Sequence, residues 1–183
     1  MRRHEVFTRR TTTHNESISL TPPRLYRQER DWTCSVACLR TILSAFMDEV
    51  PAEDSFVVNC GMQPGPCYSG GVKTQGLLNE EEYDVVYGID HPEIEFEDIL
   101  DLMKEGYYIM LESMVNYAHW MVLLGYYAIA PHDNMENYQL LFYDPYYNQV
   151  RMINADEFIG MWIDGNYENT KVEKDFVAVR KKK

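Results

Sequence analysis

Four residues in this sequence have the types and the order that catalysis by an activated thiol requires: Gln28, Cys34, His119 and Asp144. A histidine can take the proton of a cysteine thiol, and a carboxylate can hold the histidine ring in the required tautomer. A glutamine amide can donate a hydrogen bond to the oxyanion that forms when a thiolate attacks a carbonyl carbon. These four residues therefore predict covalent acyl chemistry with Cys34 as the nucleophile.

The segment 33–47 predicts the helix that positions Cys34. Its apolar residues recur every three or four positions: Val36, Leu39, Leu43 and Phe46. Either Asp31 or Thr33 can cap the N-terminus of this helix. A thiol in the first turn feels the positive end of the helix dipole, which favours thiolate over thiol.

The segments 119–127 and 138–143 predict two neighbouring strands of an antiparallel sheet. His119 starts the first strand, and Asp144 follows the second strand directly before Pro145. Because antiparallel neighbours run in opposite directions, the start of one lies beside the end of the other. We therefore expect His119 and Asp144 to meet at one end of the sheet.

The remaining pattern predicts an α+β domain in which helices come first and antiparallel strands follow. The other expected elements are helices at 73–82, 92–104 and 154–162 and strands at 83–87, 107–112, 149–153 and 175–179. We expect one domain over residues 21–180. Residues 1–20 are polar and basic and are expected to form a flexible arm.

The chain of 183 residues carries a formal net charge of -12, although both of its ends are basic. An acidic body repels phosphate backbones, so nucleic acid is not expected as the main partner. The N-terminal residues lack the apolar region of a secretory signal, and no apolar run is long enough to span a membrane. We therefore expect a cytoplasmic protein without membrane association. The sequence leaves the oligomeric state open.

The four cysteines predict neither a metal site nor a disulfide framework. Cys34 and Cys38 are one helical turn apart, whereas Cys60 and Cys67 are seven positions apart in a loop rich in glycine and proline. Structural zinc sites use closely spaced cysteine pairs in turns instead. We expect no metal and no cofactor.

The loops at 61–72 and 113–118 are expected to border a substrate groove, because one follows the Cys34 helix and the other leads into His119. The candidate substrate-binding residues are Tyr68, Gly70, Gly71, Tyr117 and Trp120. Ordinary packing stays open as an alternative for the three aromatic residues, and a tight turn stays open for the two glycines.

The sequence resembles the C39-like peptidases, a branch of the papain-like cysteine peptidase superfamily. The resemblance is carried by residues 28–39, 119–126 and 144–148, which read QERDWTCSVACL, HWMVLLGY and DPYYN. It implies a papain-like fold, with an N-terminal helical lobe that holds the nucleophile helix and a C-terminal antiparallel β-sheet lobe. It also implies Cys34 as nucleophile, His119 as base, Asp144 as the residue that orients the base, and Gln28 as oxyanion donor. The DWTC wording resembles in addition a group of eukaryotic guanylyl-cyclase-domain-containing proteins of related fold.

Taken singly, each catalytic candidate is typical of an ordinary structural role in a core, a strand end or a turn. Their joint order favours a stand-alone thiol hydrolase that cleaves a peptide or isopeptide bond in a peptide or protein substrate. Two alternatives stay open. The same fold could pass the acyl group to an amine or thiol as an acyl or peptidyl transferase, or the domain could be a non-catalytic peptide-binding module.

Overall fold

The computed structural model describes residues 14–65, 67–114, 117–163, 165–167 and 170–183. Within them, a seven-stranded sheet has the strand order β2-β9-β3-β4-β5-β6, and β1 pairs with the part of β4 that extends past the first residue of β3. All of its pairings are antiparallel. The strands are β1 (Glu16–Ser19), β2 (Tyr83–Tyr87), β3 (Tyr108–Ser113), β4 (His119–Ala128), β5 (Tyr138–Asp144), β6 (Gln149–Asn154) and β9 (Phe176–Lys181). A separate hairpin joins β7 (Gly165–Tyr167) to β8 (Thr170–Val172).

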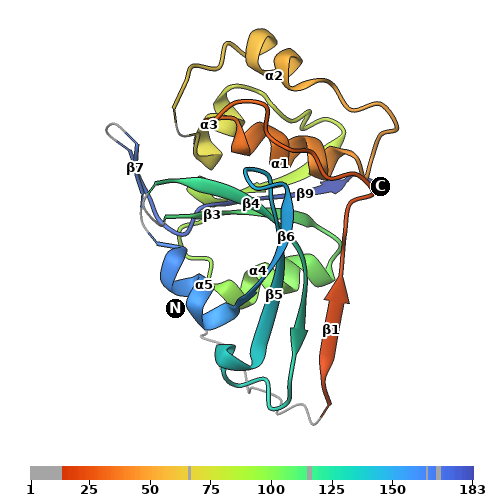
Figure 1. Ribbon diagram of the computed structural model, residues 1–183, viewed down its shortest axis with the longest axis vertical. Coiled ribbons are helices and arrows are strands. Elements are labelled where there is room, and N and C mark those ends of the chain that lie inside the picture. The colour runs from red at the N-terminus through yellow and green to blue at the C-terminus, as the bar shows by residue number, and fades with distance from the viewer. Residues whose placement is uncertain (1–13, 66, 115–116, 164, 168–169) are drawn as a thin grey trace, which may run out of the picture.

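Helices cover both faces of this sheet, so the molecule has three layers (Figure 1). The helices are α1 (Cys34–Leu43), α2 (Glu53–Asn59), α3 (Ser69–Thr74), α4 (Phe96–Lys104) and α5 (Ala155–Met161), with short 3-10 turns η1 (Gly88–Asp90) and η2 (Met135–Asn137). One apolar core joins α1, α2 and α3 to one face of the sheet. A second core joins α4 and α5 to the other face.

The expected α+β class with an antiparallel sheet is confirmed, and the helices lie on both faces of that sheet. Helix α4 carries an apolar stripe that includes Phe96, Ile99 and Met103, all of them buried. These side chains pack on the sheet face that α1 leaves open, against residues such as Ile109 and Phe142. Because a two-faced sheet has two apolar surfaces to cover, the helices divide between them.

The expected flexible arm over residues 1–20 is wrong for its last part. Glu16–Ser19 form β1, which pairs with β4 from Gly125 to Ala128. Ile18 and Leu20 pack against the second core, because alternate residues of a strand face the same side. Gly125 makes the pairing close: a Cβ atom there would lie 2.3 Å from the Ile18 carbonyl oxygen. Residues 1–13 of the expected arm lie outside the described residues.

Helix α1 starts at Cys34, one residue later than expected, and ends at Leu43 rather than at residue 47. Neither expected cap is made by a side chain. The Thr33 hydroxyl instead donates to the Arg30 carbonyl at 3.0 Å and accepts from the Arg30 amide at 3.1 Å. Thr33 therefore closes the turn that leads into the helix, and the amides of the first helical turn stay without a side-chain cap.

Most other expected elements are confirmed, with shifted ends. The helix expected at 73–82 is instead α3, which starts at Ser69 inside the glycine-rich loop. Helix α4 starts at Phe96 because Glu95 and Asp98 form a capping box there. Helix α2 is not predicted by the sequence. No helix of the described residues has both the length and the apolar character to cross a bilayer.

Candidate active site

The pairing of β4 with β5 brings His119 to Asp144. Val122 faces Tyr143 across this antiparallel pair, so the start of β4 lies beside the end of β5. The His119 Nε2 atom is 2.9 Å from Asp144 Oδ1. The expectation that these two residues meet at one end of the sheet is confirmed.

Asp144 is held by more than its histidine. Its side chain is only 1% exposed, and Oδ1 also accepts hydrogen bonds from the backbone amides of Tyr146 at 3.0 Å and Tyr147 at 3.3 Å. Arg151 Nε lies 3.3 Å from Oδ2, close enough for an ion pair, although no aligned hydrogen bond forms there. Burial opposes ionisation, but the bond and charge of His119, the Tyr147 amide and Arg151 outweigh it and lower the Asp144 pKa. Asp144 is therefore a carboxylate at neutral pH.

His119 is a cation in this setting. Its burial acts to lower its pKa, but hydrogen bonds with Asp144 and Cys34, and the charges of both, raise the pKa to about 9. Because Nε2 is taken by Asp144, the other ring nitrogen, Nδ1, is the one that remains for Cys34. The arrangement is the one that a thiolate–imidazolium pair needs.

Cys34 occupies the first position of α1 and is partly exposed, while the next nine residues of the helix are buried. Its backbone N–H belongs to the first turn, where no helical carbonyl can accept it. The other thiols are in less reactive settings: burial raises the pKa of Cys38, Cys60 and Cys67, in the last case to about 12. Of the four cysteines, Cys34 alone combines exposure with a histidine partner.

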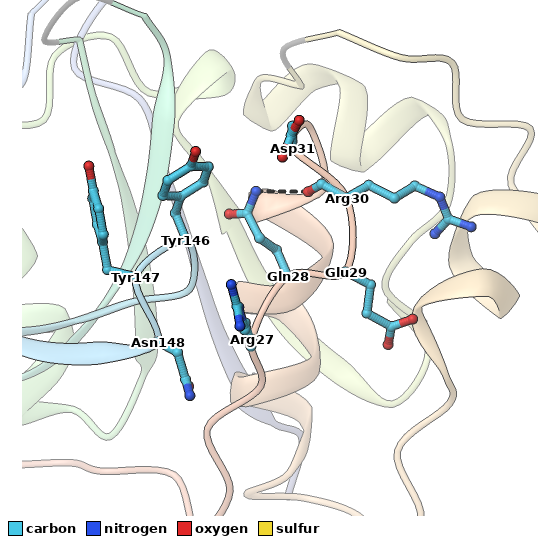
Figure 2. A pocket seen from close by; sticks show the side chains of 8 residues that line it. All are labelled: Arg27, Gln28, Glu29, Arg30, Asp31, Tyr146, Tyr147 and Asn148. Carbon is cyan, nitrogen blue, oxygen red and sulfur yellow. Dashed lines mark hydrogen bonds between the residues drawn. The ribbon is translucent and has the colours of Figure 1, made fainter.

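Gln28 lies on the strand-like segment that runs past the start of α1, and its side chain is largely buried. Its backbone N–H donates to the Pro145 carbonyl at 3.2 Å, which ties this segment to the turn after Asp144. One side-chain N–H donates to the Arg30 carbonyl at 2.8 Å, as Figure 2 shows. The second side-chain N–H stays available for an oxyanion, and Oε1 is buried without a partner.

Glu53 of α2 anchors the same segment and is not predicted by the sequence. Its buried carboxylate accepts from the Glu29 amide at 2.9 Å and pairs with Arg30 at 3.1 Å.

Arg151 and Tyr146 are two further site residues that the sequence does not predict. The Tyr146 ring packs edge-on against the His119 ring, with 6.4 Å between centroids. The sequence gives one indication of this ring contact, which is the presence of aromatic residues shortly after Asp144.

The expected groove residues are not all placed alike. Tyr117 is 60% exposed, and desolvation, followed by the charges of Tyr146, Tyr147, Asp144 and Cys34, raises its pKa. The loop residues 66, 115 and 116 lie outside the described residues.

Gly70 and Gly71 lie in the first turn of α3. A Cβ atom on Gly70 would lie 2.3 Å from the Tyr68 ring, so the glycine lets this ring fold over the helix start. At Gly71 the nearest atom would be Cys67 Sγ at 3.1 Å. The two glycines therefore shape the loop that presents Tyr68.

Trp120 does not offer a surface to substrate. It is 1% exposed, and its indole N–H donates to the Cys67 carbonyl at 2.5 Å. Successive residues of a strand point to opposite faces, so the residue after His119 is directed into the core beneath α1. Trp120 holds the glycine-rich loop in place, which corrects its assignment as a substrate contact.

A cavity of about 740 Å³ lies between residues 27–31 and the turn at 146–148, which follows Asp144 in the chain (Figure 2). Gln28 and Tyr146 both line it, whereas Cys34 does not. Among the described residues, no group of three or more histidine, cysteine, aspartate or glutamate side chains is placed to hold a metal ion. The arrangement brings together a partly exposed thiol, an imidazole and a carboxylate in the order that a nucleophile, a base and an orienting group require.

A scan of the chain against protein-family models finds no match, and a search of curated proteins finds no significant relative. The chemistry of the site therefore has to follow from its own geometry.

Proposed function

We propose that this protein is a thiol hydrolase that cleaves a peptide or isopeptide bond, with Cys34 as nucleophile, His119 as acid and base, and Asp144 as orienting carboxylate. The observation that carries the proposal is the 2.9 Å bond between His119 Nε2 and Asp144 Oδ1. Cys34, at the start of α1, lies near enough to the same histidine to help raise its pKa. A core histidine with a purely structural role has no need of a partly exposed thiol on its second nitrogen.

The reaction follows from these positions. The Cys34 thiolate attacks the substrate carbonyl carbon, and the pair of electrons of the C=O bond moves to oxygen. The resulting oxyanion accepts from the Cys34 backbone N–H and the second N–H of Gln28. The His119 imidazolium then gives its proton to the leaving nitrogen, the C–N bond breaks, and a thioester remains on Cys34. Neutral His119 next takes a proton from water, which attacks the thioester and releases the acid.

We also propose that the fold is papain-like. A helix that starts at the nucleophile, packed on an antiparallel sheet that supplies the histidine and the carboxylate, is what the resemblance to the C39-like peptidases implies. The division of helices between both faces of the sheet departs from the simplest two-lobe description.

The experiment that tests the function compares wild type with Cys34→Ala. A tryptic digest of denatured lysate proteins is incubated with each, and new peptide ends are mapped by mass spectrometry. We expect new ends with wild type only. Repeating the incubation with an added amine separates hydrolysis from transfer, since a transferase would attach the amine to the new carboxyl end. If the two proteins gave the same peptides, and wild type retained peptides without cutting them, the domain would be a binding module instead.

A further inference from the structure

The cavity between residues 27–31 and 146–148 is not accounted for by the triad alone. It adjoins the triad through Tyr146, which touches the His119 ring, and through Gln28, the expected oxyanion donor. Asp31, which also lines it, stands three residues before the nucleophile. A substrate held across Cys34 therefore has room on this side for whatever lies beyond the scissile bond.

Two of the four charged side chains of the cavity lining are already neutralised elsewhere. Glu29 pairs with Arg40 at 3.0 Å, and Arg30 pairs with Glu53 and Asp54 of α2. Figure 2 shows both side chains directed away from the turn at 146–148. They hold the segment in place and are not available to a ligand.

The other two charges are Arg27 and Asp31, and within the described residues neither has an ion-pair partner. Figure 2 places Asp31 and Tyr146 toward one end of the cavity and Arg27 and Asn148 toward the other. The lining is therefore polarised along its length.

Hydrogen-bond donors gather at the Arg27 end. Asn148 Oδ1 accepts from the Tyr143 hydroxyl at 2.8 Å, which leaves the Asn148 amide N–H groups free to donate. Burial raises the pKa of that tyrosine to about 12, and the charge of Arg27 acts against the rise. Arg27 and Asn148 both line the cavity. A guanidinium next to amide donors is a carboxylate-binding arrangement.

Hydrogen-bond acceptors gather at the other end. Gln28 Oε1 is buried and has no partner, and the Gln28 side chain lines the cavity with this oxygen on the side of Tyr146 (Figure 2). A buried acceptor without a donor is costly, so this oxygen is suited to the N–H of a bound ligand. The Asp31 carboxylate can likewise accept from an amine. A ligand that fits both ends carries a nitrogen near the catalytic residues and an anionic group farther along.

We propose that this cavity binds the leaving portion of the substrate, and that Arg27 selects leaving portions that carry a carboxylate. The proposal rests on the hydrolase function above. During cleavage the scissile nitrogen becomes an amine near Gln28 and Asp31, while the carboxylate stays on Arg27 and Asn148. That carboxylate can be the free C-terminus of the substrate or the side chain of an acidic residue after the cleaved bond.

Three versions of one peptide digest test the proposal. The first is untreated. In the second, carboxyl groups are amidated on the intact proteins before trypsin, so the side chains are blocked while most peptides keep free C-termini. In the third, amidation follows trypsin, so both kinds of carboxylate are blocked. We expect Cys34-dependent cleavage to be about threefold to tenfold lower in the third digest than in the first. The second digest identifies the source: cleavage near the first level indicates the C-terminus, and cleavage near the third indicates side chains.

The Arg27→Glu variant should lose the difference between the first and third digests, because the charge that reads the carboxylate is reversed. Lys181→Glu is the matched control, since it changes the net charge equally on the exposed end of β9, three strands from β5. It should keep the wild-type preference. Equal cleavage of all three digests by wild type would overturn this proposal and leave the hydrolase function standing. Absence of Cys34-dependent cleavage in every digest would overturn both.

Discussion

Arg151 binds Asp144 on the carboxylate oxygen that His119 does not use. His119 Nε2 is 2.9 Å from Oδ1, and Arg151 Nε is 3.3 Å from Oδ2. The guanidinium also stacks on the Tyr147 ring, with 4.7 Å from its carbon to the ring centroid. The arginine thus fixes the orientation of a buried carboxylate and compensates its charge, which makes it a positioning residue for the catalytic histidine.

Replacing Arg151 should change the pH profile of turnover. Without the guanidinium the pKa of Asp144 rises, so the acid limb of kcat/KM moves to higher pH in Arg151→Met. Because Arg151 makes the smallest of the contributions that lower this pKa, we expect a small shift of the acid limb and little loss near pH 7. Arg151→Lys keeps a positive charge and should restore most of the acid limb. If kcat/KM fell equally at every pH in both variants, the arginine would act on folding and not on the pKa of Asp144.

Alkylation should distinguish Cys34 from the other thiols. Iodoacetamide reacts with thiolates, and Cys34 has a cationic histidine beside it, whereas burial raises the pKa of the other three. Near pH 6 we expect Cys34 to be modified at least about tenfold faster than Cys60, the most exposed alternative. Mass spectrometry of digested protein measures each rate. In His119→Ala the faster modification of Cys34 should disappear. If Cys34 still reacted faster than Cys60, its reactivity would not depend on the histidine.

We expect the proton on His119 to set the alkaline limit of the proposed activity. With a pKa of about 9 the imidazolium is present below that pH, so kcat/KM should fall as pH rises through about 9. Asp144→Asn removes the carboxylate that raises this pKa, so the limit should move to lower pH while some turnover remains. His119→Ala should lower turnover by about 10²- to 10⁴-fold. A limit that stays at the same pH in Asp144→Asn would show that another group carries it.

Asp175 should make stability depend on pH below neutrality. Burial raises its pKa from 3.8 to about 6 in spite of the hydrogen bonds from Ser69 and Phe176 that favour the charged form. Because the folded-state pKa is the higher one, the contribution to stability is complete below pH 3.8 and is lost as pH rises through about 6. The loss should amount to about 2–3 kcal/mol. Urea unfolding at pH 4 and pH 7 measures it, and Asp175→Asn should remove this part of the difference.

The aromatic residues of the expected groove offer a separate test. Tyr117→Ala and Tyr68→Ala should each raise KM about threefold to tenfold, with little change in kcat, if they contact substrate. Glu105→Ala, at the end of α4 on the other face of the sheet, is the control. If Glu105→Ala raised KM while both tyrosine variants left it unchanged, the substrate groove would lie on the α4 face of the sheet instead.

The sequence predicts the triad because each member stands at the end of an element that periodicity alone reveals. Cys34 opens a helix, His119 opens a strand, and Asp144 closes its neighbour. Antiparallel pairing then fixes which ends meet. The same reasoning predicts the sheet, since its strands are apolar and well separated by turns.

The partners of the triad could not be predicted in this way. Arg151 reaches Asp144 only because the β5–β6 hairpin turns tightly, with Asn148 at a positive φ of 51°. Glu53 acts on a segment more than twenty residues earlier through a helix too short to show periodicity. The expectation that Trp120 lines the groove follows from its position next to His119. Alternation along β4 instead directs its side chain into the core. The strand at Glu16–Ser19 was hidden by the polar residues around it.

Strand β9 lies between β2 and β3. Residues 176–181 therefore join two parts of the sheet whose residues come much earlier in the sequence. A growing polypeptide that has reached Asp144 already contains every catalytic residue, yet its sheet is still split where β9 will insert. Pairings between residues so distant in sequence form slowly and late. During synthesis Cys34 should therefore behave as an ordinary thiol, and the reactive nucleophile should emerge only after these residues have left the ribosome.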